Sequence, residues 1–472
     1  MVPQLKYLGL IFDNKLSWIP HIMDLKKRTQ AIAKYLRHMQ GYRWGLNPHI
    51  HKILYQTVTE KMVTYGAAVW AQPMQGRKVR HLLSIQQQFA LNITRAFCTT
   101  ATNALNVLAP DGSFTHQQGT GSSSQLNVPA SFEDTMYWSS DYEVLAVILD
   151  KHPAEQCIGI NVSIKEQSLE THRHNTYAYT DGSKMDGQPE DIQMFNTLIF
   201  TVGSKMDHNV GCAFVMFQGK EQVTQWKGHL HGNNSVFQRK AVAIQKAVQH
   251  IASNNIKKAV IVSDSMSALR ALQNPAHSSS IVQEIQSLLR QFKHLEARLT
   301  WMKAHAGNMG NEAADLLAKD AALNKEAEEL ALPWPHSTLK RMLHLQALSK
   351  WQAEWDIAET GRRTHYYLLY VNPARLHSNP HLVRYVTGHG PFPEYFARHG
   401  TTDTDQCSCG HLGTPEHYVT TCSLTNGMHI RILTTNTQAF CKLMVKQKHL
   451  CRQLIKIMEN LASLGTDLCA AE

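Results

Sequence analysis

Long apolar runs are missing from this sequence, and cysteine is scarce. No uninterrupted hydrophobic stretch approaches the roughly 20 residues that a membrane-spanning helix needs, so no membrane interaction is expected. Nine cysteines in 472 residues argue against a disulfide framework. The first residues, MVPQLKYLGLIFDNKLSW, lack the basic start, apolar stretch and cleavage site of a secretory signal. We therefore expect an intracellular location.

Acidic residues are also in deficit, because 37 Asp and Glu face 47 Lys and Arg. The formal net charge is +10 and the isoelectric point is near 9.0. A positive surface suits a polyanionic partner such as nucleic acid. Composition leaves open the alternative that this charge serves solubility alone.

The length favours roughly three structural units. Residues Ile22, Leu25, Ile32 and Leu36 recur at helical spacing, with Lys and Arg between them, which predicts a basic amphipathic helix. A stretch from Pro110 is rich in Gly, Ser, Thr and Gln and reads as a linker. We divide the chain into a mainly helical N-terminal region (1–109), a linker with an irregular segment (110–175), an α/β domain (176–324), a helical connector (325–400), a small Cys/His module (401–430) and a C-terminal helix (431–472).

Three acidic residues stand in distinctive contexts within the α/β domain. Asp181 lies in YTDGSK and Asp264 ends the apolar run AVIVSD, so both are placed at the ends of predicted strands. Asp315 lies near the start of a predicted helix. A single aspartate of this kind is ordinarily a helix cap or a solvated strand end. Three together could converge on divalent cations, which prefer hard oxygen ligands.

The segments TDGSK, NNSVFQ, VSDSMSAL and WMKAHAGNMGNEAADLLAK together resemble the ribonuclease H domain of non-LTR retrotransposons. This resemblance implies an α/β fold with a mixed five-stranded sheet and flanking helices. It also implies hydrolysis of the RNA strand of RNA/DNA hybrids, with two Mg²⁺ or Mn²⁺ ions. By motif position it assigns the metal site to Asp181, Asp264 and Asp315, and a role in proton transfer or product release to His305.

The sequence departs from this family at the fourth acid. A glutamate is expected in the first helix of the domain, but Arg239 and Lys240 stand there. Lys240 follows Phe237 by three positions and precedes Ile244 by four, which places it on the packed face of the helix. An ammonium would remove one ligand and repel dications, so we expect weak or absent hydrolysis. The alternative is a nucleic-acid-binding remnant without catalysis.

An apparent repeat leaves the position of the first strand open. AYTDGSKMD (178–186) is echoed by IFTVGSKMD (199–207), where Val202 replaces the aspartate. Only the second copy runs through a short loop into the alternating strand GCAFVMF. If residues 198–202 rather than 177–181 form the first strand, Asp181 is displaced. Such a repeat also allows that the chain has decayed and does not fold coherently.

The N-terminal segment KYLGLIFDNKLSW, followed by YGAAVW, resembles the tail of the reverse transcriptase of the same elements. No YADD-like pair occurs, so polymerase chemistry is not expected from this chain. The basic helix either helps to hold a duplex or is a structural remnant. The resemblance to a retroelement implies access to the nucleus, although no basic stretch forms a clear localisation signal.

The C-terminal part contains a C-x-C-x7-H-x4-C pattern formed by Cys407, Cys409, His417 and Cys422. It resembles the terminal Cys/His module of these polyproteins. Three thiolates and one imidazole suit tetrahedral Zn²⁺ in a closed structural site. The alternative is a group of reduced cysteines in a small core.

Overall fold

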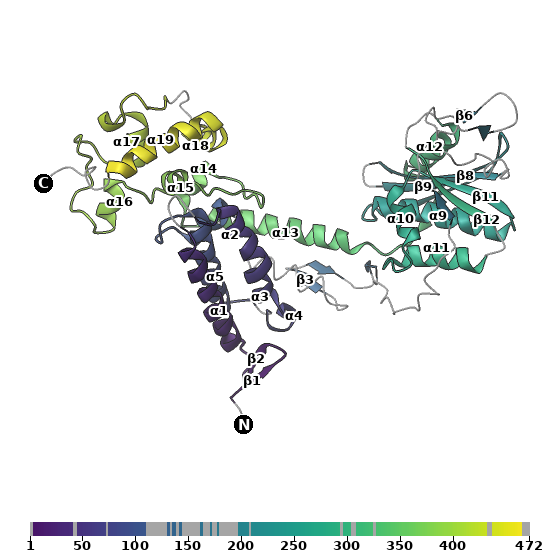
Figure 1. Ribbon diagram of the computed structural model, residues 1–472, viewed down its shortest axis with the longest axis horizontal. Helices are drawn as coiled ribbons and strands as arrows, with labels where there is room; N and C mark the ends of the chain where they lie inside the picture. Colours follow the sequence, from purple (N-terminus) through teal and green to yellow (C-terminus); the bar gives the residue numbers. More distant parts are fainter. Residues whose placement is uncertain are drawn as a thin grey trace. The chain divides into compact units, whose positions relative to one another are not determined.

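The computed structural model contains two compact units, one made of Met1–Met136 with Met342–Glu472 and one of Tyr137–Arg341 (Figure 1). None of the helices that it describes combines the length and hydrophobicity required to cross a membrane. The structure describes the chain except for residues 1–2, 41–44, 72–73, 110–129, 133–134, 138–140, 144–160, 164–169, 172–176, 179–196, 207–208, 293–295, 304–307, 324–326, 432–436 and 465–472.

A mixed β-sheet forms the centre of the unit Tyr137–Arg341, in the order β13-β10-β9-β8-β11-β12-β5. Its long strands are β8 (Thr197–Met206), β9 (Asn209–Gln218), β10 (Glu221–Leu230), β11 (Lys258–Ser263) and β12 (Glu296–Trp301). The first three are antiparallel neighbours, whereas β8, β11 and β12 run parallel. This confirms the predicted five-stranded sheet, and the short strands β13 (Glu328–Leu330) and β5 (Asn161–Ser163) extend its edges.

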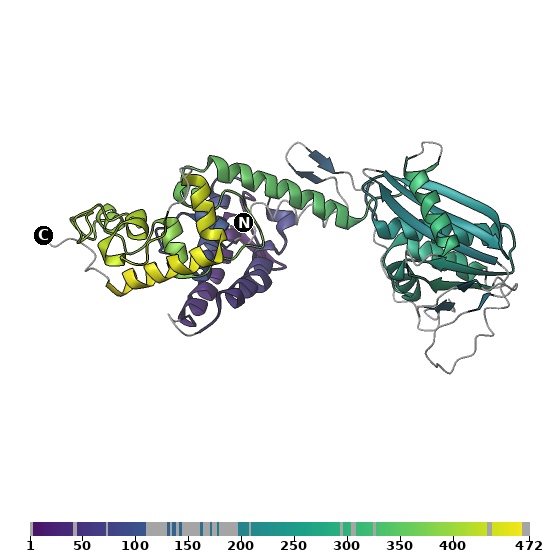
Figure 2. The same cartoon turned by 90° about the horizontal axis from the view of Figure 1, so that it is seen from above.

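Helices cover both faces of this sheet (Figure 2). One face packs against α9 (Val236–Ser253), α10 (Met266–Gln273) and α11 (Ser280–Gln291), and the other against α12 (Met309–Leu323). Successive side chains of a strand point to opposite faces. Accordingly, Ile199 of β8 lies in the core on the side of α9, α10 and α11. Phe200 and Val202 lie in the core on the side of α12.

Two local features set the positions of the helices that carry site residues. α9 begins with a capping box, because Ser235 and Gln238 each accept a hydrogen bond from the other's backbone N–H. This fixes Lys240 in the first turns of α9. On the opposite face, α12 approaches β9 so closely that a Cβ on Gly211 would collide with the backbone oxygen of Ala318. Glycine and the buried alanines of α12 therefore allow this helix, with Asp315, to lie directly on the sheet.

The N-terminal helices form the first core of the other unit. α1 (Ile19–His38) and α5 (Arg77–Thr94) pack together, and Ile22, Leu25, Leu82 and Ile85 are buried between them and their neighbours. The chain also forms a hairpin of β1 (Gln4–Tyr7) and β2 (Leu10–Asp13), then α2 (Pro48–Leu54), the π-helical turn η1 (Tyr55–Thr59), α3 (Glu60–Thr64) and α4 (Ala67–Trp70). The expected mainly helical N-terminal region is confirmed.

A second core in this unit joins segments that the sequence suggested were separate. Val107 of α6 (Thr102–Leu108) shares a hydrophobic cluster with Trp355, Val383, Tyr418 and Ile457. The contributing helices are α13 (His336–Ile357), α14 (Arg362–Tyr367), α15 (Pro380–Thr387), α16 (Pro393–Arg398), α17 (Pro415–Thr420), the 3-10 turn η4 (Ser423–Thr425), α18 (Thr437–Lys446) and α19 (Lys448–Leu464). The connector, the Cys/His module and the C-terminal segment are thus one packed body, and two helices replace the single expected C-terminal helix.

Short strands complete the described secondary structure. β3 (Ala130–Phe132) pairs with β4 (Thr135–Tyr137) in one two-stranded sheet, and β6 (Glu170–Thr171) pairs with β7 (Tyr177–Ala178) in another. Both lie in the region predicted to be a linker with irregular structure or at its border with the α/β domain. Neither pair joins the seven-stranded sheet.

Arg239 is a stability liability in α9, because its side chain is only 2% exposed. Its Nη2 donates to the carbonyl of Asn234 at 3.0 Å, while Nε and Nη1 have no partner among the described residues. Burial lowers the pKa of Arg239. We predict that Arg239→Met stabilises this unit by about 1–3 kcal/mol in thermal unfolding, since a buried charge without a counter-ion is removed. Arg239→Lys, which keeps the charge, should give no gain. Destabilisation by Arg239→Met would contradict this interpretation.

Candidate functional site

The first-strand position is occupied by the second copy of the repeat. Residues 198–202 lie in β8, which pairs with β9 on one side and with β11 on the other. In the β8–β11 register Thr201 faces Ser263, so Val202 and Asp264 are the next residues along these two parallel strands. Asp181 lies outside the described residues. A buried valine therefore stands where the resemblance requires the first carboxylate.

Lys240 occupies the position expected for the glutamate, as its helical spacing predicted. Its Nζ donates to Oδ2 of Asp264 at 2.8 Å, and the two side chains are only 18% and 7% exposed. Gly203 of β8 makes room for this arrangement, because a Cβ there would lie 3.2 Å from Cγ of Lys240. The site thus contains an internal ion pair at the point where a metal ion would need an unprotonated, accessible carboxylate.

The remaining acid, Asp315, is also paired with a lysine. Nζ of Lys319 lies 2.8 Å from Oδ2 of Asp315, one turn further along α12. The sequence reasoning missed this pair, although an aspartate followed by a lysine four positions later on a helix is a recognisable signal. His305, the predicted histidine, lies outside the described residues.

The electrostatic balance of this site is therefore unlike that of a cluster of carboxylates. Of the expected acids, the described structure holds Asp264 and Asp315, each neutralised by its own ammonium. Oδ1 of Asp264 is buried and has no hydrogen-bond partner in the described part of the chain. Among the described residues these acids do not belong to any group of three or more that could hold a metal ion. The two described acids, each paired with a lysine, do not by themselves supply the ligands for two divalent cations.

The Cys/His residues, in contrast, converge as their spacing predicted. One ligand atom from each of Cys407, Cys409, His417 and Cys422 lies within 4.8 Å of all the others. Sγ of Cys407 is 3.7 Å and Sγ of Cys409 is 4.0 Å from Sγ of Cys422, and Sγ of Cys409 is 3.1 Å from Nε2 of His417. In a tetrahedral zinc site, bonds of about 2.3 Å to sulfur and 2.0 Å to nitrogen separate ligand atoms by about 3.5–3.8 Å. These four residues could hold such an ion.

Protonation in this cluster is compatible with a cation. Burial, together with nearby His411 and His429, lowers the pKa of His417, so its ring is neutral and can act as a ligand near pH 7. Burial opposes ionisation of Cys407, but a hydrogen bond from the backbone of Cys409 and further hydrogen bonds outweigh it and lower its pKa. Burial raises the pKa of Cys422 to about 12. A cation would be needed to keep all these thiols deprotonated at once.

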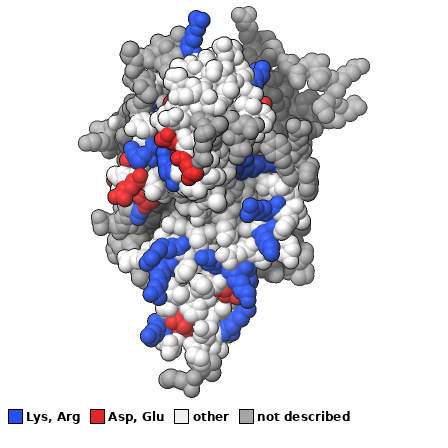
Figure 3. Space-filling model, turned by 90° about the vertical axis from the view of Figure 1, so that its left-hand side faces the viewer, with Lys and Arg blue, Asp and Glu red and all other residues white. Residues whose placement is uncertain are grey.

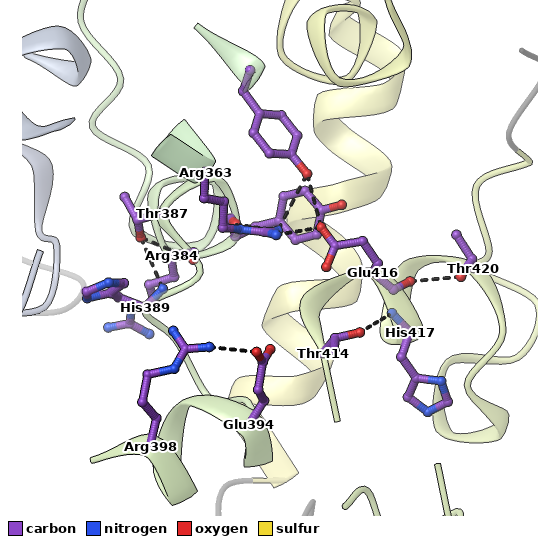
Figure 4. A network of polar contacts seen from close by, with 12 residues as sticks. Arg363, Arg384, Thr387, His389, Glu394, Arg398, Thr414, Glu416, His417 and Thr420 are labelled. Carbon is purple, nitrogen blue, oxygen red and sulfur yellow. Dashed lines mark hydrogen bonds and ion pairs between the residues drawn. The ribbon is translucent and has the colours of Figure 1, made fainter. Parts of the chain in front are cut away.

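The His417 ring is oriented by its own helix. Oγ1 of Thr414 caps α17 by accepting a hydrogen bond from the backbone N–H of His417, as Figure 4 shows. Nδ1 of the ring lies 3.1 Å from Oγ1 of Thr421, which leaves Nε2 facing the thiols. The preceding residue, Glu416, forms an ion pair with Arg363 of α14. These contacts tie α17, which carries His417, to the rest of the unit (Figure 4). Cys407 and Cys422 belong to the hydrophobic core of the same unit.

Comparison with known proteins identifies the domain that carries the paired acids. A family model described as RNase H matches residues 195–323. This range starts just before β8 and ends with α12, so it includes Val202 and excludes Asp181. Residues 195–323 are therefore a ribonuclease H domain.

Curated relatives of the chain include proteins of retrotransposable elements. The chain is 28% identical over 104 residues to a 115 kDa protein in the type-1 retrotransposable element R1DM of Drosophila melanogaster, covering 22% of this chain and 10% of that protein. It is 27% identical over 114 residues to a Pol polyprotein from the R1 3 element of Nasonia vitripennis, covering 23% of this chain and 30% of the relative. The chain is thus homologous in part to R1 non-LTR retrotransposon polyproteins, but its matches span only a small share of their length.

Cellular enzymes and solved structures also match. Ribonuclease H of Tropheryma whipplei (strain Twist) is 39% identical over 61 residues, which cover 13% of this chain and 36% of that enzyme. Among solved structures, RNase H1 from Halobacterium salinarum NRC-1 is 17% identical, with a TM-score of 0.22, and covers 26% of this chain and 96% of that chain.

Replacing Asp264 should change the stability of the domain in opposite directions for an ion pair and for a cluster of carboxylates. We predict that Asp264→Asn destabilises the domain by about 2–4 kcal/mol in chemical denaturation, because Lys240 is left as an unpaired, largely buried charge. Adding Lys240→Gln should recover most of this loss. In a cluster of like-charged carboxylates, removing one acid relieves repulsion. Stabilisation by Asp264→Asn alone would therefore show that Lys240 does not pair with it.

Proposed function

We propose that the ribonuclease H domain binds the RNA/DNA hybrid that this family recognises but does not hydrolyse it. The observation that carries this proposal is the 2.8 Å ion pair between Lys240 and Asp264. A bound dication would have to displace an ammonium that already neutralises its ligand, in surroundings where repulsion between cations is weakly screened. With Val202 in β8, the first expected carboxylate is absent from that strand as well.

Binding without cutting needs no metal ion, because the phosphates of a hybrid can be neutralised by protein cations. The pairs Lys240–Asp264 and Lys319–Asp315 carry no net charge, so they do not repel phosphates as unpaired carboxylates would. We expect the affinity of the full chain for a labelled hybrid to be the same with and without added Mg²⁺ at constant ionic strength, and to fall as salt increases. The net charge of +10 supports the same class of partner.

Ribonuclease H-type hydrolysis by two metal ions is the second candidate. It is favoured by the retention of Asp264 and Asp315 at the positions that the family uses. It requires Asp181 and His305 to complete the site, in competition with Lys240. Two paired acids are insufficient for this chemistry, since each ion needs several oxygen ligands.

Cleavage of a labelled RNA/DNA hybrid by the full chain, with Mg²⁺ or Mn²⁺, distinguishes the two candidates. We predict no cleavage by the unaltered chain and none by Lys240→Glu, because β8 still lacks a carboxylate. Val202→Asp/Lys240→Glu should gain metal-dependent cleavage, since it returns both missing acids. If the unaltered chain cuts and Asp264→Asn does not, hydrolysis is the function and the proposal fails.

We further propose that Cys407, Cys409, His417 and Cys422 bind one structural Zn²⁺. The ligand distances and the neutral His417 support this assignment. Zinc would cross-link α17 to the turn before it and would leave no open position for catalysis.

Zinc content and melting temperature test this site. Cys409→Ser should abolish zinc retention and lower the melting temperature by more than about 5 °C, because metal binding contributes to folding. Cys98→Ser is the matched control, since Cys98 is an exposed free cysteine outside the cluster. Equal melting temperatures for both variants, with no zinc in the unaltered chain, would contradict the zinc site. The four residues would then be reduced cysteines and a histidine in a small core.

A further inference from the structure

A hollow of about 630 Å³ in the unit Met1–Met136 with Met342–Glu472 lies outside both sites described above. Residues of two helices line its walls. α1 presents Gln30, Ala33, Lys34 and Arg37. α5 presents Gln88, Leu91 and Asn92, and Arg95 follows as the left-handed C-cap of α5. Positions i, i+3, i+4 and i+7 share one helix face, so the two stripes face a common space.

The floor of the hollow is held by hydrogen bonds between the two helices. Nδ2 of Asn92 donates to the carbonyl of Ala33 at 3.0 Å, and Nε2 of Gln40 donates to the carbonyl of Asn92 at 2.9 Å. These bonds fix the register of α1 against α5. The cationic residues beside them are therefore presented by a rigid scaffold rather than by a loop.

The lining contains four cations, Lys34, Arg37, Arg95 and Arg384, and no acidic residue. Within the described residues, neither Lys34 nor Arg37 forms an ion pair, and Nε of Arg95 is buried without a hydrogen-bond partner. Both helices end near this hollow, and each C-terminus carries a partial charge of about −0.5. Lys34 and Arg37 alone exceed this charge of about −1, so the hollow has a net positive charge.

A cation-rich, polar hollow of this kind suits phosphate groups. The stripe from Gln30 to Arg37 extends for about 10 Å along α1. One strand of a nucleic-acid duplex carries about three phosphates over that distance. Amide side chains of Gln30, Gln88 and Asn92 add neutral donors that can hydrogen-bond phosphate oxygens. Figure 3 shows Lys and Arg side chains gathered over the N-terminal helices, with fewer acidic side chains among them.

We propose that this hollow is a second nucleic-acid site, which binds the phosphodiester backbone of one strand between α1 and α5, with Arg384 of α15 at its rim. The site is independent of the ribonuclease H domain and does not rest on the function proposed for that domain. It contacts phosphates only, so it should bind RNA and DNA with little sequence preference.

Binding of a short fluorescein-labelled oligonucleotide to the full chain tests the site by fluorescence anisotropy. The test variant is Lys34→Gln/Arg37→Gln, which alters two exposed side chains of α1. The matched control is Lys27→Gln/Arg80→Gln, which removes the same charge from exposed positions on α1 and α5 that do not line the hollow. Melting temperatures verify that both variants fold.

We expect the test variant to weaken binding by about tenfold or more at low salt and to lower the salt slope by about 1.4–1.8, because two phosphate contacts are lost. The control should change affinity by less than about threefold. Equal weakening by both variants would mean diffuse attraction to a basic surface and would overturn the site. The site is also overturned as a nucleic-acid site if the test variant loses affinity for tripolyphosphate but not for the oligonucleotide.

Failure of this proposal can be separated from failure of the proposed function. Asp264→Asn and Lys240→Gln change the ribonuclease H domain and leave the hollow intact, because all of its lining residues belong to the other unit. Arg95→Gln provides an independent variant on α5. It should weaken oligonucleotide binding by itself, and unchanged affinity would contradict a contribution of Arg95 to the site.

Discussion

The ion pair between Lys240 and Asp264 joins the first helix of the ribonuclease H domain to the end of a central strand. An ammonium held by its own helix cannot diffuse away as a metal ion can. The pair therefore supplies the counter-charge that keeps a buried aspartate in the fold. We propose that it also withholds Asp264 from a metal ion, which would impair two-metal hydrolysis.

Burial of hydrophobic side chains organises the rest of the molecule. In the domain, successive side chains of β8 point into two different cores, and Val202 lies in the core next to α12. In the other unit, a single cluster joins helices from before and after the domain in sequence. The Cys/His residues are part of that cluster, since Cys407 and Cys422 are fully buried.

The resemblance to a known family predicted the ribonuclease H fold, while local patterns predicted the direction of Lys240 and the convergence of the Cys/His ligands. These last two depend on spacing within one helix or one short segment, which the sequence shows directly. The choice between 177–181 and 198–202 stayed open, because both copies have strand-like composition. Pairing with β11 favours the copy that also pairs through a short loop with β9. Asp181 and His305 lie outside the described residues, so their predicted roles in the metal site stay predictions.

Long-range packing was harder to predict. The amphipathic helices near the C-terminus indicate that each has an apolar face, but not that α6 from the N-terminal region covers part of it. The hollow between α1 and α5 likewise depends on the register of two helices separated by some forty residues of sequence. The resemblance of the N-terminal region to a reverse transcriptase tail remains a prediction.

Anomalous scattering at the manganese edge, from crystals of the chain grown with Mn²⁺, would show whether Lys240 or a metal ion neutralises Asp264. We expect no manganese peak at Asp264 and an Nζ of Lys240 within hydrogen-bonding distance of its carboxylate. Two manganese ions bridged by Asp264, with Lys240 turned away, would contradict this expectation.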